Sequence, residues 1–351
     1  MPFCRCTRFW RRRAVIATVA LALAFSLLAS GGDRAEAAEN GKGFYLLGSK
    51  TTTAGFIPPP GTYGTDYNYF YSGDACCTAA DGVALNDLGN ITLQADIGVD
   101  AQLYIKILSV LKITETKIFG GNFGYGILVP IGTQDISVDL DALVTLTLAN
   151  GTTVQKARHF SFDDDTFAFG DPVLMSLLGW HSGNWHWNVT GLLNVPIGSY
   201  DKNDIANNGF NRWGFDSTFS ATWLDPQRGL EVSGAVGATF NGENSDTNYE
   251  TGTELHAEYA VMKILSKAFS IGVAGYNYNQ VTGDSGRGAT LGSFKGQTNA
   301  IGPNINYNFQ FGNTPVSTTF RWFHEYDVKN RLKGDAFYIN ATIPLGGPHR
   351  Q

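Results

Sequence analysis

Three titratable side chains, Glu254, His256 and Glu258, stand at every second position of one short segment. In an extended strand this spacing places all three on one face, where two carboxylates and an imidazole could bind a metal or select permeants by charge. If such strands close into a barrel, charges that face inward can instead pair with one another and simply hold its wall together, and this second interpretation is favoured. The spacing itself predicts only the shared face.

Other charged residues fall on the polar face of segments with a strand-like pattern. Arg212 precedes Asp216 by four residues, and Arg321 precedes Glu325 by the same number, so each pair shares a face. Such residues line a constriction if the strands form a channel. The full set of lumen or constriction candidates is Arg212, Asp216, Glu231, Glu254, His256, Glu258, Arg321 and Glu325.

Two further motifs contain residue types used in chemistry. The acidic run Asp163–Asp165 indicates either a site for calcium or a lipopolysaccharide-bridging cation, or a solvated loop, and the loop is favoured. A lipase in the membrane would need a serine next to His181, His186 or His324 on an adjacent strand, which a sequence cannot establish. We predict no catalytic residues, no metal and no cofactor, and therefore no enzyme.

The composition indicates which class of protein must position these side chains. Of the 351 residues, 42 are glycine, 13% are aromatic and only 16% are charged, whereas charged residues usually make up about 25% of a soluble domain. Outside the N-terminal stretch, no run of about 18 apolar residues indicates a transmembrane helix. The formal net charge of −6 opposes nucleic-acid binding. A secreted β-protein and a transmembrane β-barrel remain.

Residues 1–37 have the features of a cleaved secretory signal peptide. Five arginines precede the apolar stretch 14–30, and Ala35–Ala37 is a small-residue cleavage site. The alternative is an N-terminal membrane anchor. Cys76 and Cys77 are adjacent, so they form either a strained vicinal disulfide or two loop thiols.

Alternation of apolar and polar residues recurs through the rest of the chain and predicts strands of about ten residues. In 299–311, for example, isoleucine, tyrosine and phenylalanine oppose a face of asparagine and glutamine. Connections are alternately long and polar (148–171, 197–211) and tight (181–183, 312–314). Strands are predicted at 135–148, 171–180, 184–195, 212–223, 230–241, 254–261, 268–280, 299–311, 315–326 and 336–345, with weaker candidates near 62–72, 91–106 and 122–131.

Short strands joined by alternately short and long connections are typical of an outer-membrane barrel. The sequence therefore predicts an all-β protein, a transmembrane antiparallel up-and-down β-barrel of 12–14 strands after a cleaved signal peptide. A soluble β-sandwich is the alternative, but tryptophans near strand ends on the apolar face resemble a membrane-interface girdle. The predicted parts are the signal peptide 1–37, an N-terminal extension or cap 38–61, the barrel 62–346 and a C-terminal tail 347–351.

The motif FIPPPG at 56–61 cannot lie in a central strand, because its three prolines donate no ladder hydrogen bonds. One interpretation is a cap or plug at the barrel mouth, in which nearby tyrosines offer an aromatic path for apolar solutes. The other, which is favoured, is that these tyrosines form the first strand and an aromatic girdle. The candidates for the aromatic path are Tyr63, Tyr67, Tyr69 and Tyr71.

Five segments in a fixed order carry a family resemblance. They are FIPPPGTYGTDYNYFYSGD (56–74), FGDPVLMSLLGWHSGNWHWNVTGLLNVPIGSYD (169–201), GTELHAEYAV (252–261), GVAGYNYNQVTGDSG (272–286) and AIGPNINYNF (300–309). Over residues 43–346 the chain resembles the proteobacterial outer-membrane proteins named for the meta-cleavage pathway of phenol degradation. This resemblance implies a barrel that passes aromatic or other hydrophobic small molecules.

We therefore expect an outer-membrane channel for the passive uptake of small organic solutes, aromatic or hydrophobic ones in particular. The expected location is the outer membrane of a Gram-negative cell, reached by export through the signal peptide. The expected partners are outer-membrane lipid, lipopolysaccharide, the barrel-assembly machinery and the solutes themselves, but not nucleic acid. The alternatives are a closed barrel with a structural or anchoring role and, less favoured, a membrane-embedded lipid hydrolase.

Overall fold

A computed structural model describes residues 43–84, 89–289 and 292–346, so the predicted signal peptide and C-terminal tail lie outside the described residues. Among the described residues, no helix is long and apolar enough to cross a membrane. The strands are β1 (Gly61–Ala84), β2 (Gly89–Ile118), β3 (Gly121–Leu148), β4 (Thr153–Phe169), β5 (Val173–Ser182), β6 (Trp185–Asn194), β7 (Gly214–Asp225), β8 (Leu230–Asn241), β9 (Glu243–Asn244), β10 (Tyr249–Glu250), β11 (Glu254–Ile264), β12 (Phe269–Gln280), β13 (Gln297–Phe311), β14 (Thr314–Lys329) and β15 (Lys333–Gly346).

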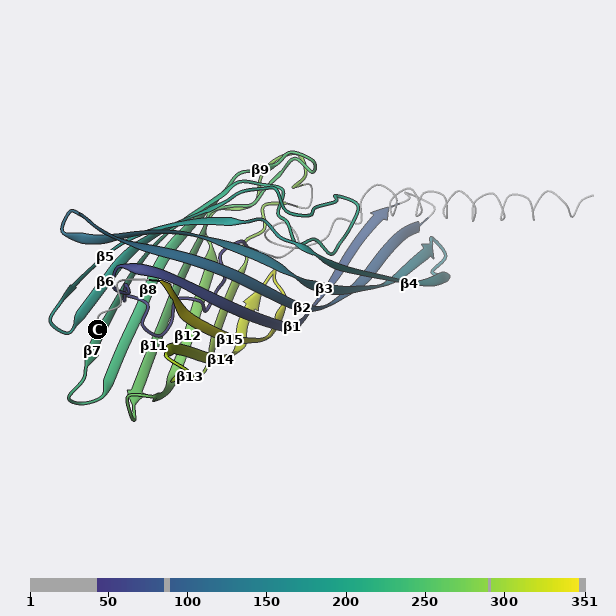
Figure 1. Ribbon diagram of the computed structural model, residues 1–351. Coiled ribbons are helices and arrows are strands. Elements are labelled where there is room, and N and C mark those ends of the chain that lie inside the picture. Colours follow the sequence, from purple (N-terminus) through teal and green to yellow (C-terminus); the bar gives the residue numbers. More distant parts are fainter. Residues whose placement is uncertain (1–42, 85–88, 290–291, 347–351) are drawn as a thin grey trace, which may run out of the picture. The chain divides into compact units, whose positions relative to one another are not determined.

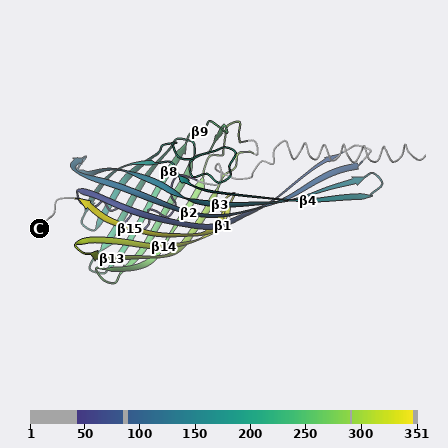
Figure 2. The same ribbon diagram turned by 45° about the vertical axis from the view of Figure 1, so that its right-hand side comes forward.

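Twelve of these strands close into an antiparallel barrel (Figures 1 and 2). The order around it is β2, β1, β15, β14, β13, β12, β11, β8, β7, β6, β5 and β3, and the pairing of β2 with β3 closes the ring. β4 pairs with β3 outside the ring, and β9 and β10 form a small sheet of their own. Closure removes the unpaired edges that lipid could not satisfy. The predicted fold class is thus confirmed, at the lower end of the predicted strand number.

The chain divides into two compact units. The larger unit contains the barrel, and the smaller one contains parts of four long strands. In the smaller unit, β3 and β4 form a hairpin in which Leu148 N donates to the Thr152 carbonyl and His159 Nδ1 lies 2.9 Å from Asp141 Oδ1. The larger unit comprises 36–77, 97–140 and 160–351, and the smaller one includes 78–96 and 141–159.

Side chains of the barrel strands are sorted by the predicted alternation. On β7, Phe215 and Phe219 point outward and are about half exposed, whereas Asp216 and Thr218 point inward and are fully buried. Outward tryptophans such as Trp185 remain exposed as well. The barrel is therefore apolar outside and polar inside along these strands, the reverse of a soluble domain and the arrangement that a bilayer requires.

The prediction of two separate strands at 122–131 and 135–148 is wrong, because the single strand β3 continues without a break through both ranges. The physical reason lies at Pro130. The register of β3 with β5 ends at the Leu128–Val173 pair, and beyond it the neighbour is β4. Pro130 lies at this change of partner, where its missing N–H costs no ladder hydrogen bond, and its carbonyl accepts from Gly170 N.

The predicted long polar connection 148–171 is also wrong, because most of it is strand β4. Its first part, 153–159, is exposed on both faces and shows no alternation, whereas intermediate and exposed residues alternate from Asp164 to Phe169. The ladder to β3 holds this strand without a buried face. Cys76 likewise lies in β1 rather than in a loop, as a free and exposed cysteine, and the side chain of Cys77 is outside the described residues.

Gly302 of β13 faces inward, and a Cβ added there would overlap the carbonyl oxygen of Trp322 on β14. Since backbone rather than a flexible side chain blocks the space, we expect Gly302→Ala to destabilise the barrel by about 3 kcal/mol or more. Urea unfolding followed by the gel mobility of unheated samples measures this. Gly98→Ala on β2, where a Cβ meets nothing within 4 Å, is the matched control. Equal stability of the two variants would contradict the close packing of β13 on β14.

Candidate functional site

A non-strand stretch, residues 43–60, lies inside the barrel and is called the N-terminal segment below (Figure 1). At one end a Cβ on Gly43 would lie 3.2 Å from Glu254 Oε1, next to a long connection. At the other, Gly55 N donates to Thr222 Oγ1 at 2.9 Å, near the tight turn between β7 and β8. The segment therefore runs lengthwise through the interior, from the end with long connections to the end with short turns.

Two inward carboxylates of the barrel wall bind this segment. Glu258 accepts hydrogen bonds from Tyr45 Oη at 2.9 Å and from Lys50 N at 2.6 Å. Glu231 accepts from Thr53 N at 2.6 Å and from Thr52 Oγ1 at 3.0 Å. Both carboxylates are almost completely buried. Charge-assisted bonds of this kind are stronger than neutral ones, so they hold the segment firmly.

Arg321 holds the same segment through carbonyl groups. Its Nη1 donates to Gly48 O at 3.0 Å and to Ser49 O at 3.2 Å, and Tyr338 Oη donates to Leu47 O. Gly48 has a φ of +83° and no room for a side chain, because a Cβ would lie 2.7 Å from the ring of Phe323. Only glycine fits both conditions readily.

Lys50 is the one lysine of the segment, and its Nζ donates to Thr190 Oγ1 at 2.5 Å. Burial lowers the pKa of its ammonium group from 10.5 to about 8. Between pH 8 and 10.5, Lys50 binds more protons when the N-terminal segment is outside the lumen than when it is bound inside. Binding of the segment inside the barrel therefore becomes more favourable as the pH rises from 8 to 10.5. We expect sugar permeability of liposomes carrying the protein to fall over this range. Lys50→Met should remove the fall, and an equal fall in this variant would contradict the assignment.

His256 and Asp216 form a buried pair beside the segment. His256 Nε2 lies 2.9 Å from Asp216 Oδ2, and the exposed fractions of the two side chains are 1% and 0%. Asp216 also accepts hydrogen bonds from Thr218 and Thr239. The ring of Tyr45 stacks on the imidazole at a centroid distance of 3.6 Å. The pair therefore supports the segment as well as the wall.

A second polar cluster surrounds Glu325. Its carboxylate accepts from Tyr71 and Tyr276, each at 2.9 Å, and from Gly334 N at 3.0 Å. On β12, Tyr278 donates to Glu254 at 2.5 Å. Tyr276 and Tyr278 of β12 are not among the predicted site residues, although their alternation with asparagine in the sequence was a usable signal.

Between the N-terminal segment and the far wall lies a cavity of about 300 Å³. The far wall, formed by β1, β2, β3 and β5, presents mostly aliphatic side chains, including Leu103, Ile105 and Met175. Of the aromatic candidates, Tyr67, Tyr69 and Tyr71 line the cavity, and Tyr63 donates instead to the Pro59 carbonyl. Of the charged candidates, Glu254, His256 and Glu325 line it. Three of the other charged candidates, Glu231, Glu258 and Arg321, bind the N-terminal segment. Asp216 pairs with His256. Arg212 is buried just before β7, and its Nε lies 3.4 Å from Asn241 Oδ1.

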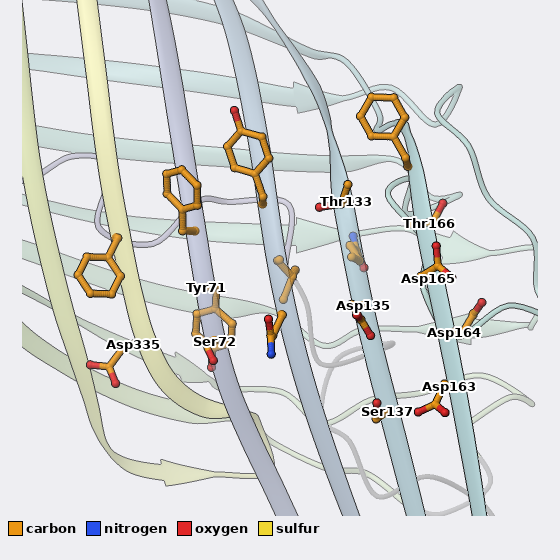
Figure 3. Close-up of a pocket in the computed structure, with 17 residues that line it drawn as sticks. Tyr71, Ser72, Thr133, Asp135, Ser137, Asp163, Asp164, Asp165, Thr166 and Asp335 are labelled. Carbon is orange, nitrogen blue, oxygen red and sulfur yellow. The ribbon is translucent and has the colours of Figure 1, made fainter.

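The acidic run forms part of a second concavity of about 890 Å³ (Figure 3). Asp163 and Asp165 line it from β4, together with Asp135 of β3 and Asp335 of β15. Asp164 also lines it and accepts hydrogen bonds from the backbone of Ile205 and Ala206 at 2.6 and 2.8 Å. The predicted loop is therefore a strand. Within the described ranges, no group of three or more histidine, cysteine or acidic side chains is arranged to hold a metal ion.

The three histidines considered for a lipase have other partners. His324 Nδ1 lies 3.1 Å from Asp335 Oδ1. The ring of His186 stacks on Phe56 of the N-terminal segment, and His181 stacks in turn on His186. In the part of the chain that the structure describes, none of these rings has a hydrogen bond to a serine. The arrangement thus gives the hydrolase interpretation no observation in its favour.

Comparison with known proteins identifies the family. The family model described as "Putative MetA-pathway of phenol degradation" matches residues 81–341, about three quarters of the chain. The chain belongs to this family. The resemblance read from the five ordered segments is thereby confirmed. No curated protein matches the chain.

One solved structure supports the fold. An outer membrane channel from Pseudomonas putida F1 is similar with a TM-score of 0.58 and 16% sequence identity, over 85% of this chain and 99% of that one. A FadL homologue from Pseudomonas aeruginosa matches more distantly, with a TM-score of 0.38 and 8% identity, over 81% of this chain and 90% of that one. The first of these likenesses establishes that the chain has the fold of an outer membrane barrel.

Proposed function

We propose that the protein is an outer-membrane channel for the passive uptake of small organic solutes, with aromatic or hydrophobic ones preferred. One observation carries the proposal. Three charged groups of the polar wall, Glu231, Glu258 and Arg321, are bound to the N-terminal segment, and the space that remains is lined largely by aliphatic and tyrosine side chains, with Glu254, His256 and Glu325 on its polar side. Such a space favours apolar solutes over hydrated ions or sugars.

In this proposal the parts of the chain have separate roles. Residues 1–37 direct export, 38–61 include the N-terminal segment that narrows the lumen, 62–346 form the barrel, and 347–351 are a tail. The apolar outward face contacts outer-membrane lipid and lipopolysaccharide, and the barrel-assembly machinery inserts it. The long connections face outward from the cell and the short turns face the periplasm.

A closed barrel with a structural or anchoring role is the second candidate. It is favoured by the same segment, which makes many hydrogen bonds along the lumen and packs Leu46 and Leu47 on the interior core cluster. If this segment never moves and the cavity does not connect the two ends, no solute passes. The two candidates therefore differ in permeability rather than in fold.

Solute entry into liposomes that carry the refolded protein decides between them. We expect 4-methylphenol to enter faster than a small sugar of similar mass, relative to liposomes without protein. The sugar also serves as a control for leakage, since a damaged bilayer would admit both. A folded barrel that accelerates neither solute would overturn the channel and leave the closed barrel, and equal acceleration of both would indicate a general pore.

A further inference from the structure

The outward face of β1 and β2 carries a cluster of polar side chains, called the polar patch below. It consists of Asp66, Asn68, Tyr104 and Lys106. Their neighbours Tyr67 and Ile105 line the interior cavity, and successive side chains of a strand point to opposite faces. The polar patch therefore points away from the lumen, and the side chains of Asp66 and Lys106 are 40% and 35% exposed.

The polar patch is enclosed by apolar surface of the kind that faces lipid. On the neighbouring strand β15, Ala341 is paired with Asp66 and Ile339 with Asn68. Large exposed apolar side chains adjoin the patch along the strands, namely Leu108 and Leu345 toward the short turns and Phe70 and Phe337 toward the long connections. The patch thus lies within the apolar band, where hydrocarbon offers no hydrogen bonds and a charged pair covered only by lipid is costly.

The contacts inside the polar patch leave hydrogen-bonding capacity unused. Lys106 Nζ donates to Asp66 Oδ2 at 2.7 Å and to Asn68 Oδ1 at 3.4 Å. Asn68 Nδ2 donates to Asp66 Oδ1 at 3.2 Å, and Asn68 Oδ1 also accepts from Tyr104 Oη at 2.9 Å. An ammonium group has three N–H donors, and a carboxylate has about four acceptor sites. Among the described residues, a donor of Lys106 and acceptor sites of Asp66 therefore have no partner.

The charges of the polar patch are complementary to themselves. Asp66 and Lys106 lie side by side on the neighbouring strands β1 and β2. A two-fold axis along the membrane normal that passes between these strands brings Asp66 of each copy opposite Lys106 of the other. The unused donor and acceptor sites then meet across the axis. A lipid headgroup fits less well, because headgroups lie outside the apolar band.

We propose that the polar patch is the contact surface between two copies of this chain in the membrane, with Asp66 of each copy paired to Lys106 of the other. The contact removes both charges from lipid and uses their remaining hydrogen-bonding capacity. Exposed apolar side chains next to the patch, such as Leu108, extend the contact. This association is independent of whether the lumen conducts solutes.

Energy transfer between donor-labelled and acceptor-labelled copies in liposomes measures the association. Cys76, which is free and exposed, takes the label, and Cys77→Ser prevents double labelling. We expect the transfer to depend on the acceptor fraction as it does in a dimer. Asp66→Lys alone or Lys106→Asp alone should weaken the association about tenfold or more, because each change places like charges opposite one another across the axis.

Mixing these two variants tests the pairing itself. In a dimer with one copy of each, two lysines on one copy face two aspartates on the other, so both contacts across the axis again join opposite charges. Association in the mixture should therefore recover to that of the unaltered protein. Residues needed only for folding would give no such recovery. Arg287→Asp, in the exposed connection between β12 and β13, changes the net charge as Lys106→Asp does and should leave association unchanged.

Unheated gel mobility checks that each variant is folded. If a charge reversal prevents folding, the double variant Asp66→Leu with Lys106→Leu makes this face apolar and should be present as single copies. Absence of transfer in the unaltered protein would overturn the proposal. Equal association of the unaltered protein and the double variant, or folded reversal variants that fail to associate when mixed, would overturn it as well.

Discussion

Deleting residues 43–57 is expected to increase sugar entry into liposomes by on the order of tenfold, because it removes the part of the chain that fills the polar half of the lumen. Without the segment, the Glu231, Glu258 and Arg321 side chains lose their partners inside the barrel and become hydrated. A lumen lined by hydrated charged side chains admits water and sugars, as in general porins. Selectivity for apolar solutes should fall as sugar entry rises.

A second deletion controls for shortening the chain. Residues 142–158 belong to the hairpin of β3 and β4 in the smaller unit, and removing them leaves the N-terminal segment intact. We expect this variant to keep the sugar permeability of the full chain. Unheated gel mobility checks that both barrels are folded. If the deletion of 43–57 leaves sugar entry unchanged in a folded barrel, the segment does not narrow the lumen.

The barrel strands were predictable because, in a strand that spans a membrane, the polarity of each side chain indicates whether it faces lipid or the lumen. On β7, the apolar residues Phe215 and Phe219 face outward, and the polar residues Asp216 and Thr218 face the lumen. Because successive side chains of a strand point to opposite faces, these residues belong to alternating faces in the sequence. Strand β4 was missed because its first part, 153–159, is exposed on both faces and so has no alternation to detect, which leaves only a short alternating stretch near Phe169. Its hydrogen bonds to β3 depend on backbone groups, which are the same for every residue except proline.

The interior was predictable only in part. Alternation placed Glu231, Glu258 and Arg321 on the inward face, and the structure has them there. It could not predict that they bind the N-terminal segment, since Glu258 and Lys50 are 208 residues apart and no local pattern links them. Arg331 gave no signal at all, because it lies in a connection whose path into the cavity depends on the whole barrel.

Replacing Arg321 by methionine is expected to make trypsin cut after Lys50 about tenfold faster or more, because two charge-assisted hydrogen bonds to the N-terminal segment are lost. In the unaltered protein Nη1 of Arg321 bonds the carbonyls of Gly48 and Ser49, next to the cleavage site. A protease needs the chain extended and accessible, so cleavage follows the fraction of molecules in which the segment has left the lumen. Mass spectrometry of the released N-terminal peptide measures the rate.

Two further variants make this result specific to the segment. Arg321→Lys keeps the positive charge but not the forked geometry, so its cleavage rate should fall between those of the unaltered protein and Arg321→Met. Arg287→Met, in an exposed connection, should leave the rate unchanged. Cleavage that is equally slow in all variants would mean that the segment is fixed by its other contacts, such as those of Glu231 and Glu258, and that solutes must pass beside it. Faster cleavage with faster sugar entry would instead make release of the segment the step that widens the channel.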